Sequence, residues 1–395
     1  MTLADPVVIA SAVRTPLGRF QGELSSLPAP VLGSTVVKAA VERAGVATDR
    51  IDEVFLGCVL PAGQGQAPAR QAARGAGLPD ATGATTVNKV CGSGMKATMI
   101  AHDLIAAGSA DIIVAGGMES MSGAPYLLKR ARGGYRFGHD QIFDHAALDG
   151  LEDAYDKGRS MGTFGEDTAE RYQFTRQMQD DYARSSLIRA RKAIEDGAFV
   201  SEIVPVTIAG KTGDIVVSID ENPGKVSPDK IAGLKPAFRA NGTITAAASS
   251  ANADGAAALV LTRRSLAERD GLPILATIRG HAGHAQEPAW FTTAPIGAIS
   301  KLLDKVGWTA GDVDLFEINE AFACVVMAAM HDLHLDHEKV NINGGACALG
   351  HPIGATGARL IVTLLGALQR HDLKRGIASL CIGGGEATAI AIERA

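Results

Sequence analysis

The sequence has few aromatic residues, no excess of one charge and no long apolar run, and each scarcity excludes a class of protein. Aromatic residues make up 5% of the 395 residues, with two tryptophans. The net charge of -5 leaves no basic stripe for binding nucleic acid. No apolar run approaches the length of about 18 residues that a membrane span needs. The first residues, MTLADPVVIASAVRTP, lack the basic lead and apolar core of a signal peptide.

Cysteine is also scarce, and its spacing excludes two kinds of site. The cysteines form no CxxC pair, so they indicate neither a zinc site nor a disulfide framework. They are Cys58, Cys91, Cys324, Cys347 and Cys381. Free thiols are typical of a reducing compartment, so we expect a cytoplasmic protein in which a thiol can have a chemical role.

Small residues, by contrast, are abundant. The 46 glycines and the 46% hydrophobic content indicate closely packed α/β layers with many strand–helix turns. Residues 7–16 predict a buried strand, residues 31–46 a helix that ends at Gly45, and residues 51–60 another strand. The length is enough for two or three domain-sized units.

This series recurs later in the chain. Residues 40–55 resemble residues 302–317, with Gly45 aligned to Gly307. A second pair follows in the same order: an apolar helical stripe and a strand come after Cys91, and again after His351. Chance similarity between α/β units is the alternative, but two matches in one order favour a duplicated α/β unit.

The middle of the chain differs from both halves. Residues 121–248 are rich in charge and poor in strand signals, and we interpret them as an insertion that carries a binding site. Within it, residues 171–194 predict one polar amphipathic helix, and residues 211–230 predict a loop. The expected division is 1–120 plus 249–268 for the first half, 121–248 for the insertion and 269–395 for the second half.

Cys91 and His351 stand just before the two matching helices. If the copies pack about a pseudo-twofold axis, the two helix N-termini approach each other and bring the thiol within reach of the imidazole. A helix N-terminus and an imidazole both favour the thiolate, which is the nucleophilic form. Taken singly, Cys91 could be a packed core thiol and His351 a capping or structural residue.

Two further polar residues stand at the ends of predicted strands. Cys381 ends GIASLC and precedes three glycines, whose bare N–H groups could bind a developing oxyanion. Asn319 ends LFEIN, and its amide could orient a water or a histidine. The alternatives are a buried strand cysteine and an N-cap of the next helix.

Four motifs, VNKVCGSG, INEAF, GGACALGHPIGATG and CIGGG, occur in this order. Together with VRTPLG near the start and GGMESMS at residues 116–122, they resemble the thiolases, which make or cleave 3-oxoacyl-CoA thioesters. The resemblance runs nearly end to end. It implies a thiolase-like fold, in which two duplicated α/β halves pack as layered αβαβα and carry an inserted loop domain.

The resemblance also implies a role for each motif residue. Cys91 takes the acyl group, His351 activates it, and Cys381 removes a proton from the α-carbon of the second acetyl-CoA. Asn319, through a water and beside the histidine, forms one oxyanion hole, and the backbone N–H groups of Cys91 and Gly383 form the other. A Claisen condensation needs both an acyl carrier and a base, which explains two thiols. No metal or redox cofactor is required.

The insertion resembles the loop domain that holds coenzyme A. Ser250 matches a serine that contacts the pantetheine arm, although residues 247–248 are Ala-Ala where Gly-Asn is usual. Ser160 stands where many biosynthetic thiolases carry histidine. Lys225 and Lys230 could approach the nucleotide phosphates or be solvated loop lysines. The residues that match positions around the thioester and acyl pocket, for each of which core packing is the alternative, are Met161, Phe238, Phe291, Ala321 and Phe322.

The leading hypothesis is the reversible conversion of two acetyl-CoA to acetoacetyl-CoA and CoA through an acyl-Cys91 intermediate. One alternative is a degradative 3-oxoacyl-CoA thiolase for longer chains, which Ser160 favours and the bulk of Phe291 disfavours. The others are a decarboxylating ketosynthase, which has no need of Cys381, and a non-catalytic CoA- or lipid-binding homologue. The resemblance further implies a homo-oligomer, either a dimer or a tetramer.

Overall fold

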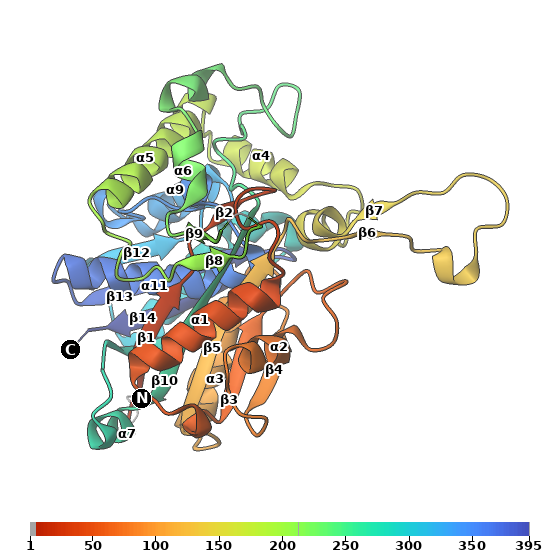
Figure 1. Cartoon of the computed structure of the whole chain (residues 1–395). Coiled ribbons are helices and arrows are strands. Elements are labelled where there is room, and N and C mark those ends of the chain that lie inside the picture. Colours follow the sequence, from red (N-terminus) through yellow and green to blue (C-terminus); the bar gives the residue numbers. More distant parts are fainter. Residues whose placement is uncertain (1–4, 212, 395) are drawn as a thin grey trace.

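Two series of elements, one in each half of the chain, make up most of the regular structure (Figure 1). The computed structural model describes residues 5–211 and 213–394. The first series is β1 (Val7–Arg14), β2 (Gly18–Arg19), α1 (Ala29–Ala44), β3 (Glu53–Gly57), α2 (Pro68–Gly75), β4 (Gly83–Val87), α3 (Ser93–Ala106), β5 (Ile112–Ser120), β10 (Ala253–Arg263) and α7 (Arg264–Asp270). The second is β11 (Ala276–Ala285), α8 (Ala294–Val306), β12 (Leu315–Ile318), α9 (Ala323–Leu333), α10 (Ala346–Leu349), α11 (Ile353–Arg370), β13 (Arg375–Ile382) and β14 (Glu386–Glu393).

Both series arrange their strands in the same order. The first gives β4-β3-β5-β10-β1 and the second gives β12-β13-β14-β11. In each, a parallel pair (β3–β5 or β12–β13) is followed by two antiparallel pairs. The first half has one further parallel pair, β3–β4. The two sheets join through a short antiparallel contact of Val8 and Ile9 in β1 with β11. The predicted duplication of an α/β unit is confirmed.

The two glycines that align in the sequence do the same work in both halves. Gly45 ends α1 with a φ of 68°, and Gly307 ends α8 with a φ of 71°. This left-handed conformation is costly for residues with a Cβ, so glycine is the favoured residue at such a helix end. Each glycine turns the chain toward the next strand, β3 or β12.

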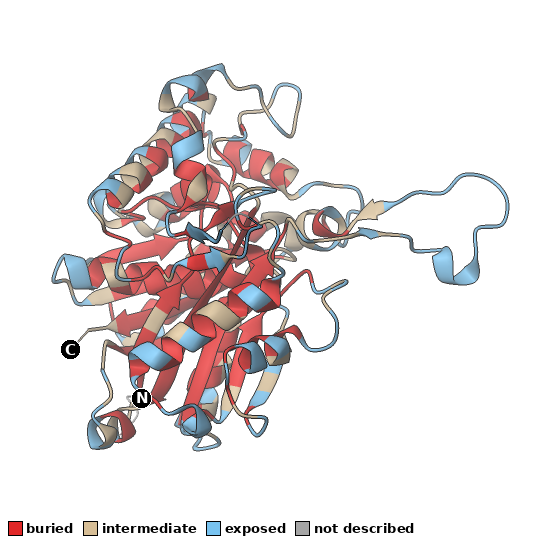
Figure 2. Ribbon diagram, in the orientation of Figure 1, coloured by how far each residue is buried: buried red, intermediate tan, exposed pale blue. Residues whose placement is uncertain are grey.

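Helices cover both sheets and also lie between them. Apolar residues of α1 and α2 pack on the outer face of the first sheet, and those of α8 and α9 pack on the outer face of the second. The third core lies between the sheets and contains α3 and α11. Figure 2 shows that these central helices and most of the sheet are buried, with the edge strand β4 as the exception, as the αβαβα prediction requires. No helix in the described part of the chain is both long and apolar enough to cross a membrane.

The central helices α3 and α11 touch backbone to backbone. A Cβ on Gly357 would lie 2.3 Å from the backbone nitrogen of Met95, and a Cβ on Gly94 would lie 3.0 Å from the backbone of α11. A Cβ on Gly117 of β5 would lie 2.0 Å from the carbonyl oxygen of Gly354. Glycine is therefore required where these elements cross, and the crossing brings the N-termini of α3 and α11 together.

The outer edges of the two sheets are treated differently. No described strand pairs with the outer edge of β4. At the corresponding position beside β12, the chain makes one parallel bridge, from Val340 to Phe316. Asn341 then covers that edge, because its side chain accepts a hydrogen bond from Ile318 N and donates one to Ile318 O, each at 2.8 Å. The second half thus lacks a counterpart of β4 and seals its edge with a side chain.

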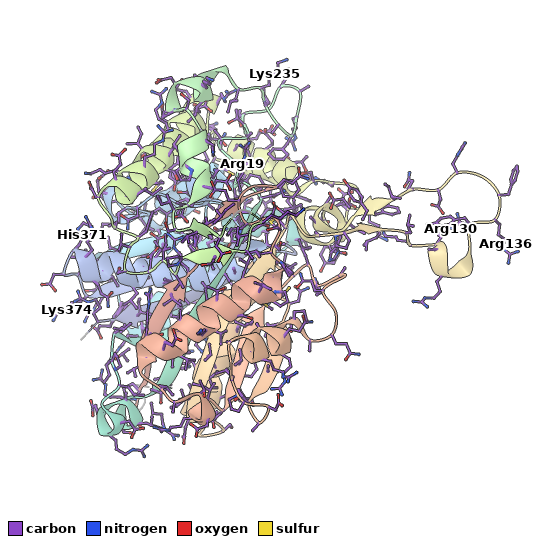
Figure 3. The ribbon with its side chains drawn as sticks, viewed as in Figure 1. Arg19, Arg130, Arg136, Lys235, His371 and Lys374 are labelled. Atoms are coloured by element: carbon purple, nitrogen blue, oxygen red, sulfur yellow. The ribbon has the colours of Figure 1, made fainter. Side chains whose placement is uncertain are left out.

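The segment between β5 and β10 forms a separate lobe and a projecting arm (Figure 1). Its elements are β6 (Tyr126–Leu127), β7 (Phe143–Asp144), α4 (Met161–Arg171), α5 (Arg176–Glu195), β8 (Val206–Ile208), β9 (Ile215–Val217) and α6 (Glu221–Lys225). The arm is the exposed hairpin of β6 and β7, with Arg130 and Arg136 near its tip (Figures 2 and 3).

Two local predictions for this segment are wrong. Residues 171–194 do not form one helix, because α4 ends at Arg171 and α5 begins at Arg176. Thr175 caps the new helix by accepting a hydrogen bond from Met178 N at 3.2 Å. Residues 211–230 are not all loop, since β9 pairs with β8 and α6 follows; Thr212 lies outside the described residues. The β-branched residues 215–217 pair with β8, a contact that the sequence pattern did not indicate.

Replacing Gly357 with alanine should destabilise the protein. The added methyl group would meet backbone rather than a movable side chain, and overpacking of this kind costs about 1–3 kcal/mol. The better helix propensity of alanine returns at most about 1 kcal/mol of this. By calorimetry, we expect Gly357→Ala to melt at a lower temperature than the wild type. Gly133→Ala should keep the wild-type melting temperature, because an added Cβ there meets no atom within 4 Å. Equal melting temperatures for the two variants would contradict the backbone contact.

Candidate active site

One cavity gathers most of the residues expected at the site. It lies at the N-termini of α3 and α11 and contains about 400 Å³ of empty space, part of it open to solvent. The expected residues that line it are Cys91, Met161, Ser250, Phe291, Ala321, Phe322, His351, Cys381 and Gly383. Four more lining residues were not expected: Val90, Gly150, Leu151 and Ile353. Asn319 and Phe238 lie behind this lining, as described below.

A tight turn presents Cys91 at the start of α3. The Ser93 hydroxyl accepts a hydrogen bond from Lys89 N at 2.8 Å and donates one to Val90 O at 2.6 Å. Val90 has a φ of 47°, an unusual value for a β-branched residue. Strain of this kind at a functional site is held by its surroundings, here by the Ser93 hydrogen bonds. The turn leaves Cys91 half-buried and facing the cavity.

The buried setting of Cys91 favours the thiol over the thiolate. Burial raises the pKa of Cys91 to about 11, and the negative charge of Glu119 adds to this rise. The backbone N–H groups of Gly383 and of Cys91 itself oppose it. The cost of desolvating the charge thus exceeds what the nearby N–H groups return, and burial opposes the thiolate that a helix start and an imidazole favour. The same two N–H groups are the ones expected to form an oxyanion hole.

Of the two ring nitrogens of His351, Nδ1 makes a short hydrogen bond and Nε2 has only a long contact with Asn319 Nδ2, at 3.5 Å. His351 Nδ1 lies 2.6 Å from Thr356 Oγ1, and that hydroxyl donates its single proton to Pro352 O at 2.9 Å. Oγ1 must therefore accept from Nδ1–H, which leaves a lone pair on Nε2. Burial lowers the pKa of His351 to about 3, and the positive charge of Arg359 contributes. The imidazole can thus accept a proton at Nε2.

Cys381 is the second thiol of the cavity and lies at the end of β13. Its side chain is buried, and burial raises its pKa well above the usual value, with the charge of Cys91 as a further cause. The turn that follows needs glycine, since Gly384 and Gly385 have φ values of 92° and 89°. This turn carries the N–H of Gly383 to the sulfur of Cys91.

Asn319 stands behind His351 rather than in the cavity wall. It follows β12, and its Nδ2 lies 3.5 Å from His351 Nε2. Its Oδ1 is buried and has no hydrogen-bond partner among the described residues. Asn319 does not cap the next helix, because the N-cap of α9 is Phe322. An amide with a free acceptor beside the imidazole can hold a water there.

The motifs did not indicate Glu119, although its buried carboxylate holds the backbone next to the site. Its carboxylate accepts hydrogen bonds from the backbone nitrogens of Val59, Leu60 and Gly354 at 2.9, 3.2 and 2.8 Å. Burial raises the pKa of Glu119 to about 7 despite these bonds. Glu119 ties β5 to the start of α11, just after His351. A charged residue in the buried run IIVAGGMES was the available signal.

Glu320 was missed as well, and it joins the insertion to the second half. Its two oxygens accept hydrogen bonds from Tyr182 and Ser186 of α5 at 2.9 and 2.8 Å. They also accept from Asn341 Nδ2 and Cys347 N, each at 3.0 Å. The residue next to Asn319 is thus fixed to the lobe by a fully bonded buried carboxylate.

Two residues singled out in the sequence do not reach the cavity. Phe238 packs edge to face against Phe322, with ring centroids 5.6 Å apart, and so supports the wall from behind. Ser160 is exposed at the start of α4. Phe238 therefore contacts the lining residue Phe322 and is not itself part of the lining, and its place around the acyl pocket stays a prediction.

A second, larger cavity adjoins the first. It has about 960 Å³ of empty space, and the basic residues that line it are Arg19 (Figure 3), Lys225 and Lys230. Ala251 lines this second cavity, and its neighbour Ser250 lines the first. The backbone at Ala251 also accepts a hydrogen bond from His351 N at 2.8 Å. One short segment thus separates a basic cavity from the two thiols.

The raised pKa of Cys91 predicts slow alkylation at neutral pH. Because the thiolate is the reacting form, the rate of Cys91 carbamidomethylation by iodoacetamide should rise about tenfold per pH unit between about pH 7 and pH 9. Peptide mapping by mass spectrometry separates Cys91 from the other cysteines, and N-acetylcysteine measured in parallel serves as the reference thiol. A rate that levels off below pH 8 would contradict a neutral resting thiol.

Comparison with known proteins agrees with this arrangement. The family model "Thiolase, N-terminal domain" matches residues 7–265, and "Thiolase, C-terminal domain" matches residues 272–394. The chain is 50% identical over 390 residues to acetyl-CoA acetyltransferase 2 of Arabidopsis thaliana, covering 98% of this chain and 96% of that protein. It is 49% identical over 389 residues to acetyl-CoA acetyltransferase of Escherichia coli K12, covering 98% of each.

Solved structures agree as well. The acetyl-CoA acetyltransferase of Bacillus anthracis superposes with a TM-score of 0.97 at 43% identity and covers 100% of both chains. The Acat5 thiolase of Ascaris suum, in complex with coenzyme A, superposes with a TM-score of 0.93 at 41% identity, over 99% of this chain and 100% of that one. Since the two family models together span both halves, the chain belongs to the thiolase family.

Proposed function

We propose that this chain is an acetyl-CoA acetyltransferase that converts two acetyl-CoA to acetoacetyl-CoA and CoA, reversibly, through an acyl-Cys91 intermediate. The observation that carries the proposal is the presence of two thiols, Cys91 and Cys381, in one small cavity with a neutral histidine. The relatives reported above are named acetyl-CoA acetyltransferases. The substrates and products would be acetyl-CoA, acetoacetyl-CoA and CoA, with no metal or redox cofactor in the reaction.

The first step transfers an acetyl group to Cys91. His351 Nε2 takes the thiol proton as the sulfur attacks the thioester carbonyl, so charge appears only as the new bond forms. The N–H groups of Cys91 and Gly383 are suited to hold the resulting oxyanion. The departing CoA sulfur needs a proton, and Cys381 can supply it. Acetyl-Cys91, protonated His351 and a Cys381 thiolate remain.

The second step forms the carbon–carbon bond. The Cys381 thiolate takes a proton from the α-carbon of the second acetyl-CoA, which restores its thiol. His351 Nε2–H and a water held by Asn319 would stabilise the enolate oxygen. The enolate carbon attacks the acetyl carbonyl, and the Cys91 sulfur leaves and recovers its proton from His351. Every proton is accounted for, and the three residues return to their neutral forms.

The second cavity suits the nucleotide part of coenzyme A. Arg19, Lys225 and Lys230 can bind phosphates, for which basic side chains are the usual partners. The segment with Ser250 and Ala251 lies between the two cavities, so a pantetheine arm passing along it would end at Cys91. Ser250 N bonds to Ala321 O at 3.0 Å, which keeps this segment against the second half.

The cavity wall favours a short acyl chain over the longer chains of a degradative 3-oxoacyl-CoA thiolase. Leu151, Phe291, Phe322 and Ile353 leave little free volume around the sulfur of Cys91. Ser160 does not counter this, because it is exposed and outside the wall. The ketosynthase alternative has no use for the buried Cys381, and a carrier that had lost catalysis has no reason to keep both thiols beside His351.

The two thiols also bear on the cellular compartment of the enzyme. Two free catalytic thiols must stay reduced, and the cytoplasm provides such conditions. We therefore place the enzyme there, as a homo-oligomer in which the open edge of β4 offers backbone groups to a second copy. A dimer uses that edge once, and a tetramer would need a further surface.

The two thiols should separate cleanly by mutation. Cys91→Ser should form no acetyl adduct when mixed with acetyl-CoA, whereas Cys381→Ala should still be acetylated on Cys91. Acetoacetyl-CoA formation by Cys381→Ala should fall by about 10²–10⁴-fold, the usual contribution of an acid–base group. Cys324→Ala, which removes a buried thiol outside the cavity, is the matched control and should keep both steps. Equal loss of acetylation in Cys91→Ser and Cys381→Ala would refute the division of roles.

Chain-length selectivity tests the substrate directly. For thiolysis, kcat/KM with acetoacetyl-CoA should exceed that with 3-oxohexanoyl-CoA by about tenfold or more, because each unaccommodated methylene costs about 1–3 kcal/mol. Phe291→Ala should reduce the ratio of the two kcat/KM values, because removing this ring enlarges the cavity. Phe137→Ala, at a fully exposed position, should leave the ratio unchanged. A higher kcat/KM of the wild-type enzyme with 3-oxohexanoyl-CoA would contradict the short-chain proposal and favour the degradative 3-oxoacyl-CoA thiolase.

A further inference from the structure

Two histidines and one aspartate form a cluster away from the acyl cavity, between α3 and β11. His102 and Asp103 are neighbours in α3, and His281 comes from β11. His102 Nδ1 lies 3.0 Å and His281 Nε2 lies 2.8 Å from the same oxygen, Asp103 Oδ1. One ligand atom from each residue can be chosen so that all lie within 4.8 Å of one another. None of the three residues lines the acyl cavity, so the acyl chemistry does not explain why they meet.

We propose that His102, Asp103 and His281 bind a divalent transition-metal ion of the zinc type. Two imidazole nitrogens and one carboxylate oxygen are a common protein donor set for Zn²⁺. In a tetrahedral site with bonds of about 2.0–2.1 Å, neighbouring ligand atoms lie about 3.3–3.4 Å apart. The two hydrogen-bonded distances, 3.0 and 2.8 Å, therefore need to open by about 0.3–0.5 Å. The third pair of ligand atoms lies within 4.8 Å and needs to close by at most about 1.5 Å.

The two imidazoles are held in place before any ion arrives. His102 and His281 are each 9% exposed, so neighbouring atoms restrict both rings. Their rings meet edge to face, with centroids 5.0 Å apart. Asp103 is exposed and can adjust its carboxylate without disturbing the core. Two fixed ligands and one mobile ligand lower the ordering cost of binding.

Binding an ion would displace the protons that now bridge the two rings and the carboxylate. His102 Nδ1 and His281 Nε2 both face Asp103 Oδ1, so each ring would carry its proton on its other nitrogen when the ion is bound.

The charged side chains near the cluster have opposite effects on the binding of a cation. Lys305 Nζ donates to the carbonyl oxygen of His281 at 3.0 Å, and Arg279 lines the adjoining cavity; both weaken cation binding. Asp304 lines the same cavity and favours it. Two cationic side chains against one carboxylate make binding weaker than the donor set alone would give.

A cavity beside the cluster gives the ion an entry path and a fourth ligand. His102 and Asp103 line it, and it has about 1180 Å³ of empty space. A water can therefore complete a tetrahedral shell from this side, as in zinc sites that keep one open position. The site would join α3, which carries Cys91 at its start, to β11 of the other half. Because the ion would bind the folded chain and not the unfolded one, it would stabilise the protein.

Zinc titration of the whole protein tests the proposal. The chain is first stripped with EDTA and treated with iodoacetamide, so that the Cys91 thiol does not bind the metal. We expect one Zn²⁺ per chain by calorimetry, a tetrahedral absorption spectrum with Co²⁺, and a melting temperature raised by about 2–4 °C with saturating Zn²⁺. Failure of the wild-type chain to bind one equivalent would overturn the proposal.

Variants locate the ion. Asp103→Asn alters an exposed side chain and should fold normally, yet it should weaken zinc binding at least about tenfold and abolish the thermal shift. His281→Gln should do the same from the other element. Asp304→Asn, which removes a carboxylate from the same cavity but not from the donor set, is the matched control and should bind within about twofold of wild type. Wild-type affinity in Asp103→Asn would refute the site.

Discussion

The arrangement of the active site depends on one contact, the crossing of α3 and α11 without intervening side chains. Gly94 and Gly357 let the two backbones touch, and Gly117 lets β5 approach α11 equally closely. With side chains at these points the helices would lie farther apart, and their first residues would separate. Because Cys91 precedes one helix and His351 the other, the distance between this thiol and this imidazole depends on glycine packing. Glu119 then fixes the start of α11 by accepting a hydrogen bond from Gly354.

The second constraint is desolvation. The buried setting keeps Cys91, Cys381 and His351 uncharged, although helix termini and N–H groups favour charge. A resting ion pair would already use the interactions that stabilise the transition state. In a neutral site these interactions form only when charge develops on the substrate in the transition state. They therefore stabilise the transition state more than the ground state, and this lowers the barrier. The thiolase likeness alone suggests which residues react, but their protonation follows from burial.

Much of the fold could be predicted because its signals are local. Gly45 and Gly307 end matching helices, the strands on either side are apolar runs, and the motif residues all fall at strand or helix ends. What could not be predicted depends on contacts between distant segments. Glu119 and Glu320 support the site through the distant groups that donate hydrogen bonds to them. Phe238 contacts the ring of Phe322, and His281 lies 178 residues from its partner Asp103. No periodicity in the sequence reports such contacts.

The duplicated halves differ in their outermost strand, and this difference limits how copies of the chain can associate. β4 leaves one sheet edge open, whereas the side chain of Asn341 occupies the corresponding edge beside β12. A chain with two open edges could pair with a neighbour on each side and extend without end, as in a fibre. With one open edge, pairing about a twofold axis uses up both available edges and stops. In the proposed homo-oligomer, the Val340–Phe316 bridge and the side chain of Asn341 would thus leave β4 as the sheet edge, among the described residues, that is open to pairing with a second copy.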